Sequence, residues 1–401
     1  MHAMPTQRRQ AAPVSHPGWS GGWHAMRDRL LASRVFQRRA SIFPLTAPIA
    51  RGRARDLFDL VAGFVYSQVL LACVQLDLFD ILAEGPQSSS ALAVRLGLPR
   101  ASADRLLAAA VSLELVERRG DGEYGLGKLG APMVGNVAVS VMVEHHVALY
   151  KDLADPVALL RGKPTTDALA HFWPYADTDA RAPDELSAAS VAGYSTLMSS
   201  SQPLVAQEIL DAYPLARHSC VLDVGGGEGS FIIQLAAHAP KLQLQLFDLP
   251  AVAERARVMC DAAGIGERVR ISGGSFLRDP LPTGADAATL VRVIHDHDDA
   301  SALRILRAVH RALPLDGTVL IAEPMAGTPG AEPVGDAYFG FYLMAMGRGR
   351  PRTADELCAL LLAAGFEDVR QLKTHMPLQT GLLVAHAGRP VSKPTLHVVK
   401  S

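Results

Sequence analysis

Residues that could do chemistry gather first in the stretch 221–230, which reads VLDVGGGEGS. Apolar residues end there at an acid, Asp223, and Gly225, Gly227 and Gly229 then fall at alternate positions. This pattern predicts a buried strand running into a turn whose backbone approaches something closely, because side chains would be in the way. A helical run follows at once, so the turn also presents a helix N-terminus. We interpret it as a turn that binds a nucleotide-like ligand, and a purely structural glycine turn is the alternative.

The glycine spacing separates the candidate ligands. A dinucleotide-binding turn has the spacing G-x-G-x-x-G, but its last position, counted from Gly225, is Ser230 here. The turn also lacks the lysine of a phosphate-binding loop. A second acid, Asp248, ends the next expected strand 25 residues after Asp223, where it can accept hydrogen bonds from both ribose hydroxyls. The pattern therefore favours S-adenosylmethionine, which needs ribose recognition and no pyrophosphate site.

A polar run, 295–299, follows the fourth expected strand, which should end near Ile294. Ligands of a doubly wound sheet lie beyond the carboxyl ends of its strands, so His295 would emerge beside the cofactor as a general base for a substrate hydroxyl. The alternative is that the run only caps a helix that begins near Asp299. No third ligand is spaced to complete a metal site with His295 and His297, so we expect no metal.

Glu323 ends the fifth expected strand, in the run Val-Leu-Ile-Ala-Glu-Pro. It should reach the same edge of the sheet, where its carboxylate could hold the second N–H of the His295 imidazole and fix the tautomer of that ring. A salt bridge at a strand end, with no part in chemistry, is the alternative.

The elements that must position these side chains alternate between strand and helix over residues 216–388. Such alternation predicts an α/β fold, a Rossmann-like parallel doubly wound sheet with an antiparallel pair at its end. The expected strands are 219–224, 242–247, 267–272, 287–294, 317–323, 366–373 and 379–387, and the expected helices are 231–238, 251–263, 300–313 and 353–364.

Four further segments complete the expected organisation. They are a basic N-terminal arm, 1–55, a helical block that ends in a hairpin, 56–135, a helical connector, 136–215, and a tail, 389–401. Helix–turn–helix followed by a two-stranded wing is a winged-helix arrangement. Its candidate recognition helix, 101–113, has few basic side chains, so we expect dimerisation and no binding to nucleic acid.

The arm is strongly basic. Residues 1–55 hold ten arginines and one acid, a net charge of +9 in a chain whose net charge is −1. Residues 22–39 read as one amphipathic helix, and a basic amphipathic helix can lie on an anionic membrane surface. The alternative is an arm that packs on its own domain or on a partner subunit.

Composition sets the broad class. The chain has 401 residues, 49% of them hydrophobic and 20% charged, which predicts a soluble globular protein of two or three domains. Its uncharged apolar runs fall short of the about 18 residues of a membrane span, and we find no signal peptide. The four scattered cysteines lack metal or CxxC spacing, so we expect reduced thiols and a cytoplasmic protein.

Five motifs occur in order along the chain: Asp223-Val-Gly-Gly-Gly-Glu-Gly, Phe247-Asp-Leu-Pro, Gly273-Gly-Ser, His295-Asp-His-Asp-Asp and Ala322-Glu-Pro. Together they resemble the S-adenosylmethionine-dependent class I O-methyltransferases of the plant natural-product and acetylserotonin type. The resemblance covers residues 56–388, including a winged-helix dimerisation domain. It implies a homodimer in which the N-terminal domain of each subunit helps to close the active site of the other.

The resemblance also implies roles for individual residues. It assigns His295 as the catalytic base and Glu323 as the acid that supports it. The implied cofactor site, for S-adenosylmethionine, consists of Asp223, Gly225, Gly227, Gly229, Asp248, Leu249, Ser275, Phe276 and Arg292.

Four positions depart from the family pattern. Val291 stands where the family carries a lysine four residues before the catalytic histidine. Ser275 stands where plant relatives carry an acid that reads the adenine amine, and His297 stands where they carry tryptophan. Pro351 stands where a second carboxylate is expected, so we expect His295 to be flanked by only one acid.

Segments near the N-terminus, beginning at Leu30, Phe43 and Phe58, resemble a narrower group, the carotenoid O-methyltransferases of the hydroxyneurosporene (demethylspheroidene) type in purple photosynthetic bacteria. This implies a hydrophobic acceptor, the tertiary 1-hydroxyl of an acyclic carotenoid. A methyltransferase for phenols or polyketides, and a non-catalytic winged-helix ligand sensor, are the alternatives. An apolar, adaptable pocket would suit a long hydrocarbon, and its candidate residues are Tyr194, Met198, Phe341, Tyr342 and Met346.

Overall fold

The computed structural model of the chain describes residues 19–164, 166–169, 202–377 and 379–389, with side chains from residue 22 onward. The chain divides into two compact units. One consists of Met1–Leu76 with Gly85–Gly127, and the other of Asp77–Glu84 with Lys128–Ser401.

The first unit combines helices with a small antiparallel sheet in which β3 lies between β1 and β2. The helical block with its hairpin, expected from the sequence, is therefore present, and β1 adds a third strand. In chain order the elements are α1 (Trp19–Ala32), α2 (Arg34–Ile42), α3 (Ala47–Gln75), β1 (Gln87–Ser88), α5 (Ser89–Arg95), α6 (Arg100–Ser112), β2 (Val116–Arg118), the 3₁₀ turn η1 (Gly120–Gly122) and β3 (Glu123–Leu126).

The arm forms two helices, where the sequence predicts a single helix over 22–39. Ser33 separates α1 from α2, because its backbone is extended and its side chain accepts a hydrogen bond from the Phe36 N–H (3.4 Å), which caps α2. Helix α3 then begins at Ala47 and runs across the boundary drawn at residue 55.

Helix α3 is unusually apolar for its exposure. By length and composition alone it could cross a membrane, and only 17% of its most apolar window is buried inside the chain. An exposed apolar surface of this kind marks an interaction site. Its large exposed apolar side chains are Ile49, Leu57, Phe58, Leu60, Val61, Phe64 and Val65.

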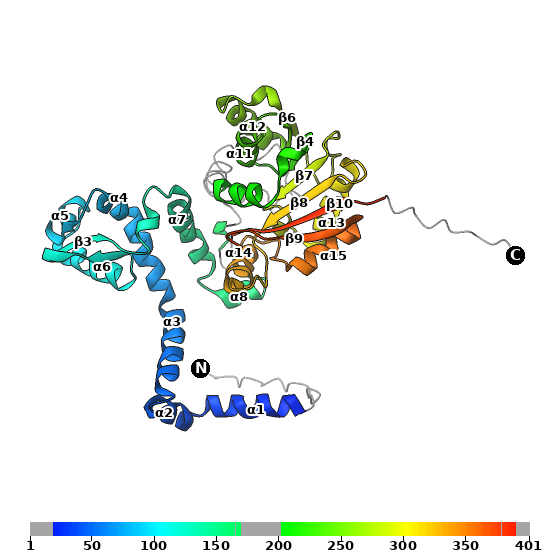
Figure 1. The fold of residues 1–401 in the computed structure, drawn as a ribbon. Coiled ribbons are helices and arrows are strands. Elements are labelled where there is room, and N and C mark those ends of the chain that lie inside the picture. The colour runs from blue at the N-terminus through cyan, green and yellow to red at the C-terminus, as the bar shows by residue number, and fades with distance from the viewer. Residues whose placement is uncertain (1–18, 165, 170–201, 378, 390–401) are drawn as a thin grey trace, which may run out of the picture. The chain divides into compact units, whose positions relative to one another are not determined.

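A seven-stranded sheet forms the centre of the second unit, in the order β6-β5-β4-β7-β8-β10-β9 (Figure 1). Its first five strands are parallel, while β10 pairs antiparallel with both β8 and β9. The predicted doubly wound sheet with an antiparallel end is confirmed. The strands are β4 (Cys220–Val224), β5 (Gln243–Asp248), β6 (Val269–Gly273), β7 (Ala287–Val291), β8 (Thr318–Glu323), β9 (Phe366–Leu372) and β10 (Gly381–Ala387).

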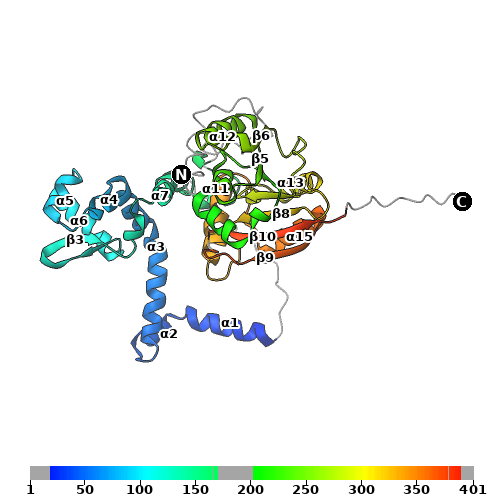
Figure 2. The same cartoon turned by 45° about the horizontal axis from the view of Figure 1, so that its top comes forward.

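Helices cover both faces of this sheet (Figures 1 and 2). One face packs against α11 (Ser230–His238), α12 (Pro250–Ala262) and a helix over 202–212, and the other against α13 (Asp299–Ala312) and α15 (Ala354–Ala364). The remaining elements of the unit are α4 (Leu78–Ala83), α7 (Val137–Asp152), α8 (Pro156–Leu160), the π-helix η8 (Pro333–Phe339), α14 (Gly340–Ala345), and the 3₁₀ turns η2 (Ala131–Met133), η5 (Leu215–Arg217), η6 (Gly266–Arg268) and η7 (Ile294–Asp296).

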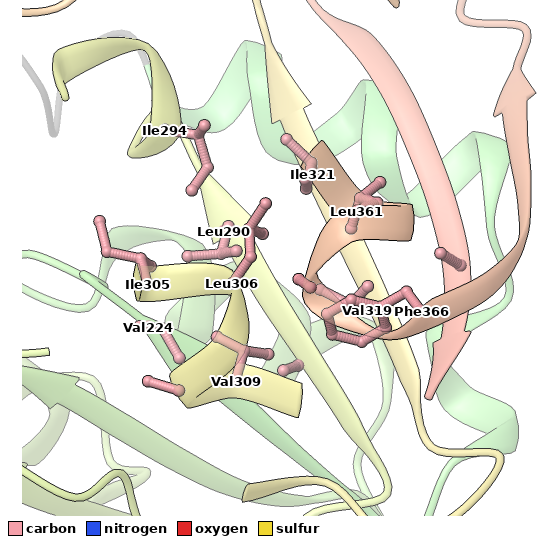
Figure 3. Close-up of a cluster of buried hydrophobic side chains, with 14 of the residues drawn as sticks. Val224, Leu290, Ile294, Ile305, Leu306, Val309, Val319, Ile321, Leu361 and Phe366 are labelled. Atoms are coloured by element: carbon pink, nitrogen blue, oxygen red, sulfur yellow. The ribbon is translucent and has the colours of Figure 1, made fainter. Parts of the chain in front are cut away.

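The core between α13 and the sheet follows directly from the sequence pattern. Ile305, Leu306 and Val309 repeat at helical spacing along one face of α13. Figure 3 shows these side chains beside Leu290 and Val319 of the sheet, and all five are 0% exposed. This packing fixes α13, and with it the loop that precedes the helix.

The loop before α13 starts earlier than predicted, because β7 ends at Val291 and not near Ile294. Arg292 has a φ of +55°, a left-handed conformation that a strand cannot continue. The chain then forms η7, and Asp298 accepts the Ser301 N–H (2.7 Å) to cap α13.

Candidate active site

The candidate residues lie at one edge of the sheet. Asp248 ends β5 and Glu323 ends β8, Asp223 is one residue from the end of β4, and Ser275 and His295 follow β6 and β7. Because β4 to β8 are parallel, their carboxyl ends meet at the same edge, where ligands of doubly wound sheets bind.

The glycine turn has the backbone shape that its sequence predicts. Gly225, Gly227 and Gly229 have φ values of +72°, +58° and +85°. A Cβ built on Gly225 would lie 2.9 Å from Val293 Cγ2, so this glycine packs tightly against the loop that carries His295. A Cβ on Gly227 would meet nothing within 4 Å, so this side of the turn is open to a ligand.

Asp248 is bonded to the glycine turn. Its Oδ2 accepts the Gly227 N–H (2.8 Å), and its Oδ1 accepts the Leu249 N–H (2.7 Å). Burial raises the pKa of Asp248 to about 6, and the two N–H groups oppose that rise. Each oxygen of a carboxylate has a further lone pair, so Asp248 can also accept hydrogen bonds from a ligand.

Asp223 presents one carboxylate oxygen that none of the described residues satisfies. Its Oδ1 accepts the hydroxyl of Thr289 (2.6 Å) on β7, whereas its buried Oδ2 has no hydrogen-bond partner among them. Burial raises the pKa of Asp223 to about 7 against the effect of the Thr289 bond. A buried acceptor of this kind, at an edge where ligands bind, is a candidate contact for a ligand N–H.

Phe276 connects the turn with the His295 loop. A Cβ on Gly225 would lie 3.5 Å from the Phe276 ring, and that ring meets His297 edge-on with centroids 5.4 Å apart. Ser275 is held beside it through its backbone N–H, which donates to Asp279 (2.7 Å).

Two carboxylates flank His295. The Nε2 atom lies 3.1 Å from Asp296 Oδ1, and the Nδ1 atom lies 3.7 Å from Glu323 Oε2. Burial alone lowers the pKa of His295, but the two carboxylates outweigh burial and the net pKa shift is upward. The expectation of a single flanking acid is wrong, because Asp296 supplies the second carboxylate from the position next to His295 itself.

The other charged or imidazole groups of this loop are held differently. The backbone N–H of Arg292 donates to the Ala322 carbonyl (2.8 Å), and its guanidinium Nη2 donates to Gln202 Oε1 (2.5 Å). Burial lowers the pKa of His297. Within the ranges that the structure describes, no group of three His, Cys, Asp or Glu residues is placed to hold a metal ion.

An aromatic wall lies beside His295. The Phe339 ring stacks on the His295 ring with centroids 6.1 Å apart, and the Tyr342 ring lies 6.2 Å from Phe339. The Tyr342 hydroxyl hydrogen-bonds to His145 Nε2 (2.9 Å) on α7. Burial raises the pKa of Tyr342, and burial together with His146 lowers the pKa of His145 to about 4. Both partners are therefore neutral near pH 7.

Three of the five pocket residues predicted from the sequence can be placed. Tyr342 and Met346 are buried in one apolar cluster, and Phe341 is half-buried. Tyr194 and Met198 lie outside the described residues.

The sequence assigned no individual role to Asp296, Phe339 or His145. Asp296 was within reach, since it stands inside the polar run that the sequence singled out. Phe339 belongs to an aromatic stripe that any core helix could show. His145 lies 197 residues from its partner Tyr342, and no local pattern links the two.

Comparison with known proteins assigns the chain to a family. Residues 150–367, more than half of the chain, match the model of the O-methyltransferase domain. The chain belongs to the O-methyltransferase family. Residues 58–136 of this O-methyltransferase match the family's dimerisation domain, which supports the predicted homodimer.

The O-methyltransferase resembles two curated relatives over most of their length. It is 43% identical to the demethylspheroidene O-methyltransferase of Cereibacter sphaeroides, over 85% of this chain and 89% of the relative. It is 40% identical to the enzyme of the same name from Rhodobacter capsulatus, over 88% of each chain. A methyltransferase of calicheamicin biosynthesis, solved with SAH bound, matches with a TM-score of 0.69 and 26% identity, over 83% of this chain and 98% of that one. The predicted enzyme class and methyltransferase fold are confirmed.

Proposed function

We propose that this enzyme transfers the methyl group of S-adenosylmethionine to the tertiary 1-hydroxyl of an acyclic carotenoid. The observation that carries the proposal is the 43% identity to a demethylspheroidene O-methyltransferase over 85% of this chain. The Phe339 ring beside His295 packs against an apolar cluster that includes Tyr342 and Met346, and this apolar surrounding supports a hydrophobic acceptor.

The residues at the sheet edge fit S-adenosylmethionine, which when bound supplies an electrophilic methyl group on a sulfonium. Asp248 would accept hydrogen bonds from the ribose hydroxyls, and the unsatisfied Oδ2 of Asp223 would accept one from the ammonium group. Phe276 offers an apolar face to the adenine. The open side of the turn at Gly227 leaves room for this ligand, and Gly225, Gly229, Leu249, Ser275 and Arg292 complete the proposed site.

In this proposal His295 is the general base. We assign Nε2 as the atom that receives the proton of the acceptor hydroxyl. This requires the ring proton to sit on Nδ1, facing Glu323, and the acceptor hydroxyl to replace Asp296 Oδ1 as the group that Nε2 contacts. Both carboxylates stabilise the imidazolium that results. A tertiary alcohol is far less acidic than imidazolium, so the proton moves late or together with methyl transfer. Much of the acceleration then comes from positioning the acceptor.

The test compares acceptors and variants in one assay. Wild type, His295→Ala and the matched control His238→Ala, an exposed histidine at the far end of α11, receive S-adenosylmethionine with 1-hydroxyneurosporene or a simple phenol. Formation of S-adenosylhomocysteine is measured. We expect turnover with the carotenoid alcohol, a loss on the order of 10²–10⁴-fold in His295→Ala, and no loss in His238→Ala.

Each contrary outcome identifies the part that fails. Turnover of the phenol but not of the carotenoid alcohol reassigns the acceptor. A fully active His295→Ala removes His295 as the base. Binding of S-adenosylmethionine without turnover of any alcohol would make the protein a ligand sensor.

The proposal extends to assembly and location. We assign dimerisation to the block 56–135, cofactor binding to 216–388 and a pocket-lining role to the connector 136–215. The exposed apolar face of α3 falls largely in the matched dimerisation domain, so a second subunit would cover it. We place the enzyme in the cytoplasm with peripheral contact to a membrane surface. The arm 1–55 is basic, and the proposed acceptor of the enzyme is a lipid-soluble alcohol.

A further inference from the structure

Arg352 is among the largest fully buried side chains of the described residues, with 1% exposure. A guanidinium carries five N–H donors and stays charged, so burying it is costly unless its donors are met. Its Nε donates to Asp299 Oδ1 (2.9 Å), at the first turn of α13. Its other hydrogen bonds go to the loop that carries His295.

Two backbone carbonyls of that loop accept from Arg352. The Nη1 atom donates to the Ile294 carbonyl (2.9 Å), and the Nη2 atom donates to the His297 carbonyl (2.7 Å). The Ile294 N–H in turn donates to Glu323 Oε1 (3.1 Å). One planar, rigid group therefore spans the loop and holds the peptide groups on both sides of His295.

The residues just before Arg352 hold His295 itself. The Arg350 N–H donates to the His295 carbonyl (2.9 Å). Gly349 has a φ of +82°, and a Cβ on it would collide with the same carbonyl oxygen. Only glycine permits this approach, so the segment 349–352 lies directly against the His295 backbone.

We propose that Arg352 is a positioning residue for methyl transfer: it fixes the backbone around His295 so that the imidazole stays between Asp296 and Glu323. The inference rests on the proposed role of His295 as the base. Arg352 acts through the backbone, since its bonds go to two carbonyls and to Asp299. The charged and titratable groups that face the imidazole are Asp296, Glu323, Arg292 and His297.

The test substitutes Arg352→Lys, which keeps the positive charge but loses the planar guanidinium whose N–H groups reach both carbonyls. The matched control is Arg268→Lys. Like Arg352, Arg268 donates to backbone carbonyls, but its three acceptors are away from the site: Ala236, Ala239 and Leu242. We measure kcat, the KM for S-adenosylmethionine, the urea unfolding midpoint, and the NMR titration of the His295 ring, assigned by comparison with His295→Ala.

We expect kcat of Arg352→Lys to fall about 10²-fold, since displacement of a catalytic group by about 1 Å has effects of that size. The KM for S-adenosylmethionine should stay within about threefold, because cofactor binding does not depend on the imidazole. The His295 titration should move down toward the ordinary histidine value as its carboxylate contacts loosen. Arg268→Lys should leave kcat, the KM for S-adenosylmethionine and the His295 titration unchanged.

An unchanged kcat and an unchanged His295 titration in folded Arg352→Lys overturn the inference. Full activity in His295→Ala would instead overturn the base assignment, so the two failures are distinguishable. If Arg352→Lys does not fold, the test passes to Arg352→Gln, whose amide can donate to one carbonyl but cannot reach both the Ile294 and His297 carbonyls. Wild-type kcat together with a wild-type His295 titration in folded Arg352→Gln also overturns the inference.

Discussion

At the scale of single residues, the proposed role of His295 as the base makes activity depend on the ionisation of its imidazole. Asp296 and Glu323 raise the pKa of His295 above its ordinary value of 6.5, although burial opposes them. A general base must be neutral before it accepts a proton. Activity should therefore be lost as the pH falls through this raised pKa, at a pH above 6.5.

Glu323→Gln tests the cause of this shift. Removing the carboxylate that faces Nδ1 should lower the pKa of His295, so the acidic limb of the kcat–pH profile moves to lower pH. The plateau at high pH should fall, because the amide stabilises the imidazolium less well. The control Glu356→Gln, at the capping box of α15, should leave the limb in place. An unmoved limb in Glu323→Gln contradicts the account.

The sequence could predict the residues whose roles follow from local pattern. Asp223, Asp248 and Glu323 each stand at a strand end, and the strand pattern alone brings them to one edge. His145 and Arg352 depend on contacts across the fold, and Arg352 binds a loop 55 or more residues away. No local spacing encodes such contacts, so the roles of these residues can be recognised only in the folded structure.

At the scale of elements, α15 provides a sharp comparison of two adjacent leucines. Leu361 is 1% exposed and packs in the core of Figure 3, whereas Leu362 is 56% exposed. Leu361→Ala should lower the free energy of unfolding by about 2–5 kcal/mol, since it leaves a cavity. Leu362→Ala should change it by no more than about 0.5 kcal/mol. Urea denaturation measures both, and equal losses would contradict the packing.

The elements of the sheet were predictable to within a few residues because apolar runs and glycine turns delimit them. Two elements differ clearly from their predicted bounds, β7 in the sheet and the helix of the arm, and both differences have backbone causes. Arg292 adopts a left-handed conformation that ends β7 early, and Ser33 caps α2 where the amphipathic pattern continues without a break. Neither an arginine nor a single serine signals such a turn on its own.

At the scale of the whole molecule, the basic arm should bind anionic membranes. Arg34, Arg38 and Arg39 of α2 are exposed, and each basic side chain near an anionic surface contributes about 1 kcal/mol. Replacing all three with glutamate should weaken binding to phosphatidylglycerol vesicles on the order of 10²-fold or more at low salt. Vesicle co-sedimentation measures this.

The matched control places the same charge change on α13, whose Arg304, Arg307 and Arg311 are also exposed. That variant should sediment with the vesicles like wild type. Wild-type protein that stays in the supernatant would contradict membrane contact and favour an arm that packs on protein.

The strand order has an evolutionary consequence. The order in which successive strands are added reverses between the parallel neighbours β4 and β7, since β5 and β6 lie on one side and β8 on the other. Most of the proposed methyl-donor contacts come from the β4–β6 side. The proposed proton-handling residues come from the segment after β7 and the end of β8, and the aromatic wall comes from η8 and α14. Selection for a new acceptor can therefore act on one half of the sheet while the other half keeps its ancestral task. We expect proteins that share this fold to vary unevenly in sequence, with most changes for new acceptors on the β7–β8 side of the boundary between β4 and β7.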